Sequence, residues 1–381
     1  MMEFRDLKRQ YKKLQTSIDN EISEVISSTH FISGEAVNKL EKILADYVGV
    51  RHCISCGNGT DAISIALMAY GIGDGDAVFV PDFTFFSSGE CPAAIGAVPI
   101  FVDVRRDTYN IDIQSLEKAI NSVKKKGRLK PRAVIAVDLF GLPAEYDGIR
   151  ALCKKHELLL IEDGAQGFGG RIGERRSCSF GDISTTSFFP AKPLGCYGDG
   201  GAIFTDSDEI ASLCRSIAIH GKNADDKYDN VRLGMNSRLD TLQAAILIVK
   251  FEAFKCYELE NVNKVANHYT NLLNDIEGLI LPTVPKGYYS SWAQYTIQLP
   301  KEIDRKMVQD RMKELDIPTM VYYTKPMHRQ GAFLGTESAS ADCPITEELC
   351  RNVLCLPIHP YLENKEIEDV VLTLVRTLQN C

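Results

Sequence analysis

Hydrophobic positions in the first fifty residues recur at the spacing of an α-helix. One apolar stripe runs through Ile18 and Val25, and a second runs through Leu40 and Leu44. The turn residues Ser33-Gly34-Glu35 separate the two stripes. The pattern therefore predicts an arm of two helices at the N-terminus.

Short apolar runs alternate with helical patterns from about residue 52 to residue 205. Continuous apolar runs are typical of strands that are covered on both faces of a sheet. The alternation predicts an α/β domain with a largely parallel sheet. The strands are expected at residues 77–81, 98–104, 133–141, 158–163 and 202–205, after a first one that ends near Cys56.

The pattern changes to α+β from residue 278 onward. Strands are predicted at 293–299 and 319–323, and helices at 306–315 and 363–378. A long helix from about 250 to 275 is expected to link the two parts. We therefore expect residues 1–255 to hold the helical arm and the large α/β domain, and residues 256–381 a smaller α+β domain.

Composition narrows the class of protein. The chain has a net charge of −8, and its one basic run, Lys124–Lys126, is better explained as a solvated helix end than as a nucleic-acid site. No apolar run is long enough to span a membrane, and the charged N-terminus does not resemble a signal peptide.

Without a signal peptide, the twelve cysteines indicate reduced thiols in a cytoplasmic protein. The Cys53–Cys56 pair is more typical of a turn than of a metal or redox site, because no second pair matches it.

Two residues predict the central chemistry. Lys192 lies on a glycine-rich turn after an apolar run, and Asp163 ends the strand predicted at 158–163. Pyridoxal phosphate (PLP) needs a lysine for its Schiff base and an acid for its pyridine nitrogen. The plainer alternatives are a surface lysine and a helix-capping aspartate.

A glycine turn, Gly57-Asn58-Gly59, precedes another predicted helix. Either Thr60 or Asp61 can cap that helix. Exposed amides at a helix N-terminus bind phosphate, although the same sequence is also an ordinary turn. No Gly-Lys-Ser/Thr follows, so this is not a nucleotide P-loop.

Six motifs in order resemble the DegT-type PLP-dependent nucleotide-sugar aminotransferases, which have the aspartate-aminotransferase (fold type I) architecture. The resemblance covers essentially the whole chain. The motifs are Gly57-Asn58-Gly59-Thr60-Asp61-Ala62, Pro81-Asp82-Phe83-Thr84-Phe85, Glu162-Asp163-Gly164-Ala165-Gln166, Ser187-Phe188-Phe189-Pro190-Ala191-Lys192, Asn236-Ser237-Arg238-Leu239-Asp240 and Leu356-Pro357-Ile358-His359-Pro360.

The resemblance implies a role for each matching residue. Lys192 and Asp163 would be catalytic, with Lys192 carrying PLP and moving the proton of the 1,3-shift. Asn236 would reach the phosphate from a neighbouring subunit, which implies a homodimer with shared active sites. The other cofactor contacts would be Gly59, Thr60 and Ser187 at the phosphate, Phe85 stacked on the ring, and Gln166 beside its 3′-oxygen.

Within this family, the chain most resembles the branch that aminates C3 of UDP-2-acetamido-2-deoxy-3-oxo-glucuronate for bacterial O-antigen sugars. The resemblance implies the same substrate, with L-glutamate as the amino donor. Arg238 would bind the sugar carboxylate, although a structural role is about equally expected. Tyr322, Tyr323 and His328 would line the sugar pocket. Tyr322 and Thr324 depart from the branch, which usually has histidine and proline there.

The alternatives are another 3-keto or 4-keto (6-deoxy) nucleotide sugar as substrate, or a PLP-binding protein that does not transaminate, such as a dehydratase or a regulator. Related dehydratases have histidine in place of the lysine, so Lys192 argues against a protein that binds PLP without transaminating. The polar residues 222–231 are predicted to form a mobile loop.

Overall fold

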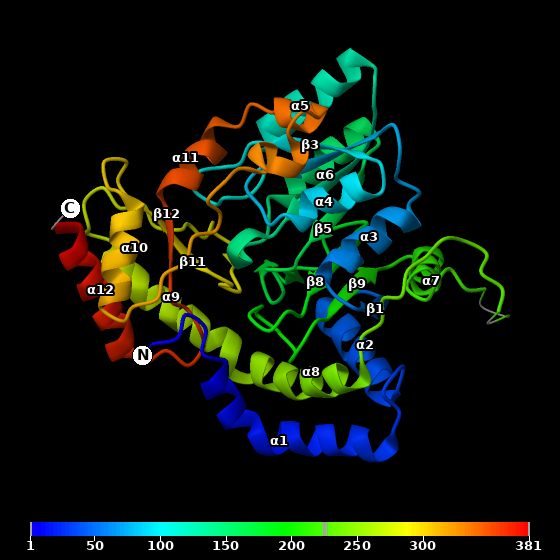
Figure 1. Cartoon of the computed structure of the whole chain (residues 1–381), viewed down its shortest axis with the longest axis horizontal. Helices are drawn as coiled ribbons and strands as arrows, with labels where there is room; N and C mark the ends of the chain where they lie inside the picture. The colour runs from blue at the N-terminus through cyan, green and yellow to red at the C-terminus, as the bar shows by residue number, and fades with distance from the viewer. Residues whose placement is uncertain (1, 224–225, 227, 380–381) are drawn as a thin grey trace.

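A computed structural model describes residues 2–223, 226 and 228–379, so part of the predicted 222–231 loop lies outside the described residues. Figure 1 shows a broad α/β body and a C-terminal part joined to it by the long helix at α8 and α9. The helices are α1 (Leu7–Ser28), α2 (Glu35–Val48), α3 (Gly59–Ala69), α4 (Ser87–Ala94), α5 (Ile113–Lys126), α6 (Tyr146–His156), α7 (Asp208–Ile217), α8 (Thr241–Ala253), α9 (Leu259–Leu273), α10 (Arg305–Glu314), α11 (Pro344–Asn352) and α12 (Asn364–Gln379).

A seven-stranded sheet forms the centre of the α/β body, with the order β1-β9-β8-β5-β4-β2-β3. Within this sheet only β9 runs opposite to its neighbours. The predicted α/β class with a mostly parallel sheet is therefore confirmed. The strands are β1 (His52–Cys56), β2 (Asp76–Pro81), β3 (Val98–Val102), β4 (Lys130–Val137), β5 (Leu159–Asp163), β8 (Ile183–Ser187) and β9 (Gly201–Thr205).

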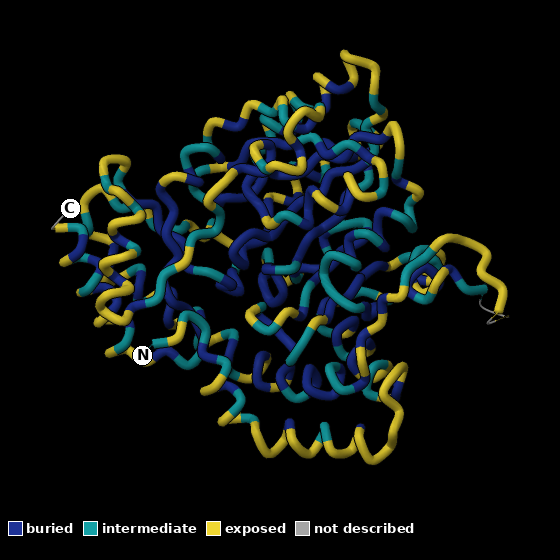
Figure 2. Tube along the Cα trace, viewed as in Figure 1, coloured by how far each residue is buried: buried dark blue, intermediate teal, exposed yellow. Residues whose placement is uncertain are grey.

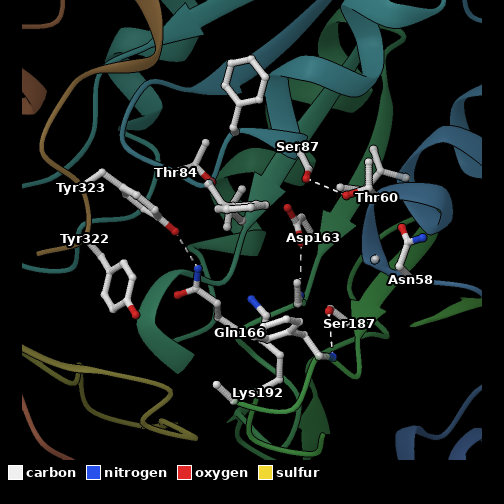
Figure 3. Close-up of a pocket in the computed structure, with 18 of the residues that line it drawn as sticks. Asn58, Thr60, Thr84, Ser87, Asp163, Gln166, Ser187, Lys192, Tyr322 and Tyr323 are labelled. Atoms are coloured by element: carbon white, nitrogen blue, oxygen red, sulfur yellow. Dashed lines mark hydrogen bonds between the residues drawn. The ribbon is translucent and has the colours of Figure 1, made fainter. Parts of the chain in front are cut away.

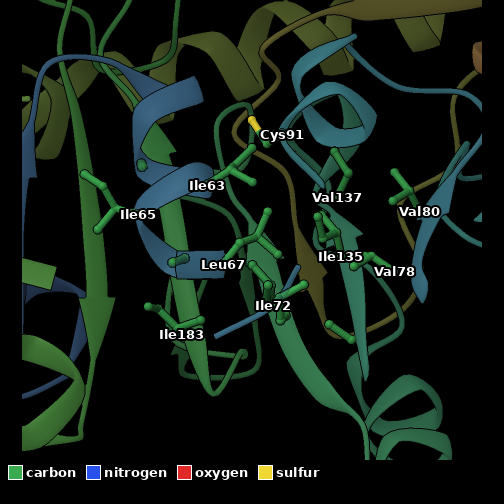
Figure 4. Close-up of a cluster of buried hydrophobic side chains, with 14 of the residues drawn as sticks. Ile63, Ile65, Leu67, Ile72, Val78, Val80, Cys91, Ile135, Val137 and Ile183 are labelled. Carbon is green, nitrogen blue, oxygen red and sulfur yellow. The ribbon is translucent and has the colours of Figure 1, made fainter. Parts of the chain in front are cut away.

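Helices cover both faces of this sheet. Side chains alternate along each strand, so Val78 and Val80 pack with α3 and α4, while Phe79 packs with α5 and α6 on the other face. Figure 4 shows the first of these clusters, with Ile63 and Leu67 of α3 against strands of the sheet. Burial on both faces explains why the strands are continuous apolar runs.

The C-terminal part has a core of its own around a two-stranded antiparallel sheet. Its strands are β11 (Tyr295–Gln298) and β12 (Val353–Leu356), and α9, α10 and α12 pack against them. A π-helical turn at Phe254–Glu258 joins α8 to α9.

The prediction of a strand at 319–323 is wrong, because only Met320 forms a bridge there, to Cys355. The remaining strands are β6 (Arg171–Ile172), β7 (Arg175–Arg176) and β10 (Tyr288–Tyr289).

The arm helix α1 lies along α8 and is exposed over most of its length (Figure 2). It buries Gln10, Ile18 and Val25. No helix in the described ranges combines the length and the hydrophobicity of a membrane span.

Candidate active site

A cavity of about 840 Å³ opens where the parallel strands end. Strands β4, β5 and β8 end at its wall, and the segments after β1 and β2 and residues of the C-terminal part form the rest of it. Ligand sites in open α/β sheets lie beyond the carboxyl ends of strands. Most of the predicted site residues line this cavity: Gly59, Thr60, Phe85, Asp163, Gln166, Ser187, Lys192, Tyr322 and Tyr323.

Lys192 and Asp163 come to the cavity from different elements, and Figure 3 shows both side chains there. Lys192 follows β8 on a turn closed by its amide, which donates to the carbonyl of Phe189 at 2.8 Å. Burial lowers the pKa of Lys192, and the charge of Asp163 opposes that change. A lysine with a lowered pKa is a better nucleophile and base near neutral pH.

Asp163 is the last residue of β5, and its carboxylate is buried. Oδ2 accepts a hydrogen bond from Ser88 Oγ at 2.7 Å, and Oδ1 accepts one from the amide of Ala165 at 3.2 Å. Burial raises the pKa of Asp163, while these bonds and the charge of Lys192 lower it. The arrangement leaves an oriented carboxylate at the cavity wall, suited to pair with a protonated ring nitrogen.

The N-terminus of α3 forms a cradle for an anion. Asn58 caps this helix by accepting from the amide of Asp61 at 2.8 Å, so the expectation that Thr60 or Asp61 caps it is wrong. Because Asn58 is the cap, the Thr60 hydroxyl can face the cavity, where it is 2.7 Å from Ser87 Oγ. A Cβ on Gly59 would lie 2.8 Å from the Cβ of Ser187, so only glycine lets α3 approach β8 this closely.

Gln166 connects two walls of the cavity. Its Oε1 accepts from the amide of Phe140 at 2.9 Å. Its Nε2 donates to the hydroxyl of Tyr323 at 3.1 Å (Figure 3). The ring of Phe85 is 55% exposed, whereas the neighbouring Phe83 is buried. A free aromatic face at the cavity is available for stacking on a flat ring.

The site residues therefore fit PLP in four separate respects. A lysine is available for the covalent bond, a buried acid for the ring nitrogen, and an exposed aromatic ring for stacking. Neutral hydroxyls and a helix N-terminus are available for the phosphate.

Asn236 and Arg238 do not line the cavity of this chain. Both are exposed, and Arg238 Nη2 donates to Asn236 Oδ1 at 2.6 Å. Ser237 between them is buried and donates to Asp61 Oδ2 at 2.6 Å. The segment is thus attached to the first turn of α3 and presents its two flanking side chains to the outside.

His328 also departs from its predicted place. It is 1% exposed and does not line the cavity, although the neighbouring Met327 does. Its Nδ1 is 2.6 Å from Asp82 Oδ2, and its Nε2 is 3.4 Å from Glu347 Oε1. In this structure His328 supports the wall from behind, so any effect on a bound sugar would be indirect.

Several residues at or near the site were not singled out from the sequence, and three of them contact its predicted residues directly. Ser87 and Ser88 follow the Pro81–Phe85 motif directly, and their hydroxyls contact Thr60 and Asp163. Their place at the start of a helix after a strand was a usable signal. Arg5 contacts the main chain of Lys192, and no local pattern indicates that contact.

The fold and this site together define a PLP-dependent transferase of fold type I. The chain belongs to the DegT/DnrJ/EryC1/StrS aminotransferase family, whose family model matches residues 12–375. Structures of such aminotransferases include one with the cofactor pyridoxamine phosphate bound. The protein is accordingly an aminotransferase that uses PLP.

The chain is 42% identical over 374 residues to the UDP-2-acetamido-2-deoxy-3-oxo-D-glucuronate aminotransferase of Pseudomonas aeruginosa, with 98% of this chain and 99% of that protein covered. It is 38% identical over 373 residues to the UDP-N-acetyl-3-dehydro-alpha-D-glucosamine 3-aminotransferase of Acidithiobacillus ferrooxidans, covering 98% and 97%. The structure of a DegT DnrJ EryC1 StrS aminotransferase from Brucella abortus superposes with a TM-score of 0.95 at 42% identity and covers 99% of both chains.

Proposed function

We propose that this enzyme transfers the amino group of L-glutamate to C3 of UDP-2-acetamido-2-deoxy-3-oxo-glucuronate, in the cytoplasm, for a bacterial surface polysaccharide such as an O-antigen. The observation that carries the transamination is the placement of Lys192 and Asp163 at one cavity beside a phosphate cradle. The similarity to the Pseudomonas aeruginosa enzyme over nearly the whole chain supports the choice of sugar.

PLP supplies an electron sink that stabilises the negative charge left when a proton leaves the amino acid. Lys192 would hold the cofactor through its amine and then, once released, would act as the base and acid for the substrate proton. Asp163 would pair with the ring nitrogen, and the exposed Phe85 would stack on the ring.

Thr60, Ser187 and the amides at Gly59 would bind the phosphate. Gln166, whose side chain accepts from the amide of Phe140, would contact the 3′-oxygen.

We further propose that Asn236 completes the phosphate site of a second copy of this chain, so that the enzyme works as a homodimer. Its exposure and its attachment to α3 through Ser237 support this role. Arg238 beside it offers a guanidinium fork for the carboxylate of the uronic acid. Tyr322 and Tyr323 line the side of the cavity where the sugar would lie.

The rival substrate is a 3-keto sugar without a carboxylate, as in the name of the Acidithiobacillus ferrooxidans relative. Transamination from glutamate should be followed with the 3-oxo-glucuronate and the 3-oxo-glucosamine nucleotides in parallel. The proposal expects a higher kcat/KM for the uronate, and it expects Arg238→Gln to lower that value while sparing the neutral sugar. Lys12→Met serves as a control for loss of one positive charge, because Lys12 is exposed on α1. Equal rates on both sugars in the wild type, unchanged by Arg238→Gln, would overturn the assignment.

A further inference from the structure

The segment ahead of α1 runs from the C-terminal core to the active site. Met2 packs against the apolar core of the C-terminal part. The ring of Phe4 meets Tyr322 of the cavity wall edge-on, with 6.5 Å between ring centroids. Arg5 Nη2 donates to the main-chain carbonyl of Lys192 at 2.9 Å. Residues 4 and 5 thus contact two parts of the site that are far apart in the sequence.

Arg5 is half-buried, and its guanidinium belongs to a polar cluster. Burial lowers its pKa to about 10, and Glu258 and Tyr361 are the neighbours that favour its charge. The charge of Arg5 in turn lowers the pKa of the buried Lys250 of α8 and of the buried His359. A partly buried charge is unfavourable unless it has polar partners, and the Lys192 carbonyl and Glu258 are such partners.

We propose that Arg5 is a positioning residue for Lys192, with its guanidinium holding the main-chain carbonyl of this lysine and placing a positive charge near its turn. The contact joins the segment ahead of α1 to the loop between β8 and β9. Because hydrogen bonds from a charged donor are stronger than neutral ones, Arg5 restricts where the lysine side chain begins.

The charge of Arg5 also acts on Lys192. Burial lowers the pKa of Lys192, and among the described residues the charge of Asp163 raises it and that of Arg5 lowers it. Removing the charge of Arg5 should therefore favour the ammonium form. A higher pKa of Lys192 would leave less of its free amine at any pH below that pKa. The inference rests on the proposed role of Lys192, but its test does not require transamination.

The experiment labels cofactor-free protein with trace acetic anhydride across a pH series and quantifies acetylation of the Lys192 peptide by mass spectrometry. The variants are Arg5→Met, which removes the charge and the fork, and Arg5→Lys, which keeps the charge. Lys12→Met on the exposed face of α1 is the control for net charge. Melting curves check the fold, and Arg5→Gln replaces Arg5→Met if that variant does not fold.

We expect Arg5→Met to shift the labelling midpoint of Lys192 to higher pH, with Arg5→Lys close to the wild type. In the loaded enzyme, both variants should lower kcat with glutamate more than they change KM, because the turn is less well fixed in both. A midpoint and a kcat for Arg5→Met that equal those of Lys12→Met would overturn the proposal. Failure of the proposed function is recognised separately, because borohydride would then fix the cofactor on a residue other than Lys192.

Discussion

Replacing Gly59 with alanine tests the cradle at the start of α3 without touching any charged group. The added Cβ would lie 2.8 Å from Ser187 Cβ and 3.3 Å from Ser187 Oγ, at the point where α3 meets the end of β8. Non-bonded carbon atoms do not approach each other that closely, so either the start of α3 or Ser187 must move. Both are proposed phosphate ligands, and the displacement should therefore weaken cofactor binding.

The size of the effect follows from the cost of overpacking a tight contact. Inserting a methyl group into a well-packed site costs about 1–3 kcal/mol. If the substitution destabilises the PLP-bound protein by this amount and leaves the cofactor-free protein unchanged, the dissociation constant of PLP rises about 5-fold to 150-fold. A smaller change is expected in the melting temperature of the cofactor-free protein, because there the helix start can relax without a ligand to satisfy.

Trp292 is the only tryptophan in the chain, and Gln294, two residues further on, lines the cavity. Quenching of its fluorescence during titration of cofactor-free protein with PLP gives the dissociation constant. Gly73→Ala is the matched control, because its Cβ would meet only the carbonyl of Ile95 at an ordinary 3.5 Å. If Gly59→Ala bound PLP as tightly as Gly73→Ala, the close approach of α3 and β8 would have no role in binding.

Three further outcomes are expected. Asp163→Asn should lower kcat about a hundredfold or more while cofactor absorbance remains, because a neutral amide cannot keep the ring nitrogen charged; a wild-type kcat would contradict the pairing. The hydrogen bond to Asp82 raises the pKa of His328 above 6.5, so His328 adds stability that is complete below that value and lost as pH rises through the folded-state pKa. Denaturant unfolding should show the destabilisation by His328→Gln to be larger at about pH 6 than at about pH 9, and an equal loss at both would refute the linkage. Among the described cysteines, the exposed Cys256 should react first with a thiol reagent and Cys53, whose pKa is raised by burial, should react late; fast labelling of Cys53 mapped by mass spectrometry would contradict its burial.

The large sheet was predictable because its strands are buried on both faces and therefore leave continuous apolar runs. The position of the site followed from the same reasoning, since Asp163 ends one such run and the carboxyl ends of parallel strands meet at one edge. Local sequence predicted that a helix begins after Gly57-Asn58-Gly59, but not that Asn58 rather than Thr60 or Asp61 caps it.

The sequence was less informative where long-range contacts decide the outcome. His328 is held away from the cavity by Asp82, which is distant in the sequence, and no periodicity indicates that pair. The segment 319–323 is rich in strand-forming residues, but only Met320 finds a bridging partner. The contact of Arg5 with Lys192 likewise depends on how the arm lies across the folded domain.

The proposed function depends on Lys192 carrying the cofactor. The most direct measurement is borohydride reduction of the PLP-loaded enzyme, which makes the lysine–cofactor bond permanent, followed by peptide mapping before and after incubation with L-glutamate. The label is expected on Lys192, and prior incubation with glutamate, which releases the lysine, should greatly reduce it. A label on another lysine, or labelling of Lys192 unaffected by glutamate, would show that Lys192 does not carry the cofactor through the reaction.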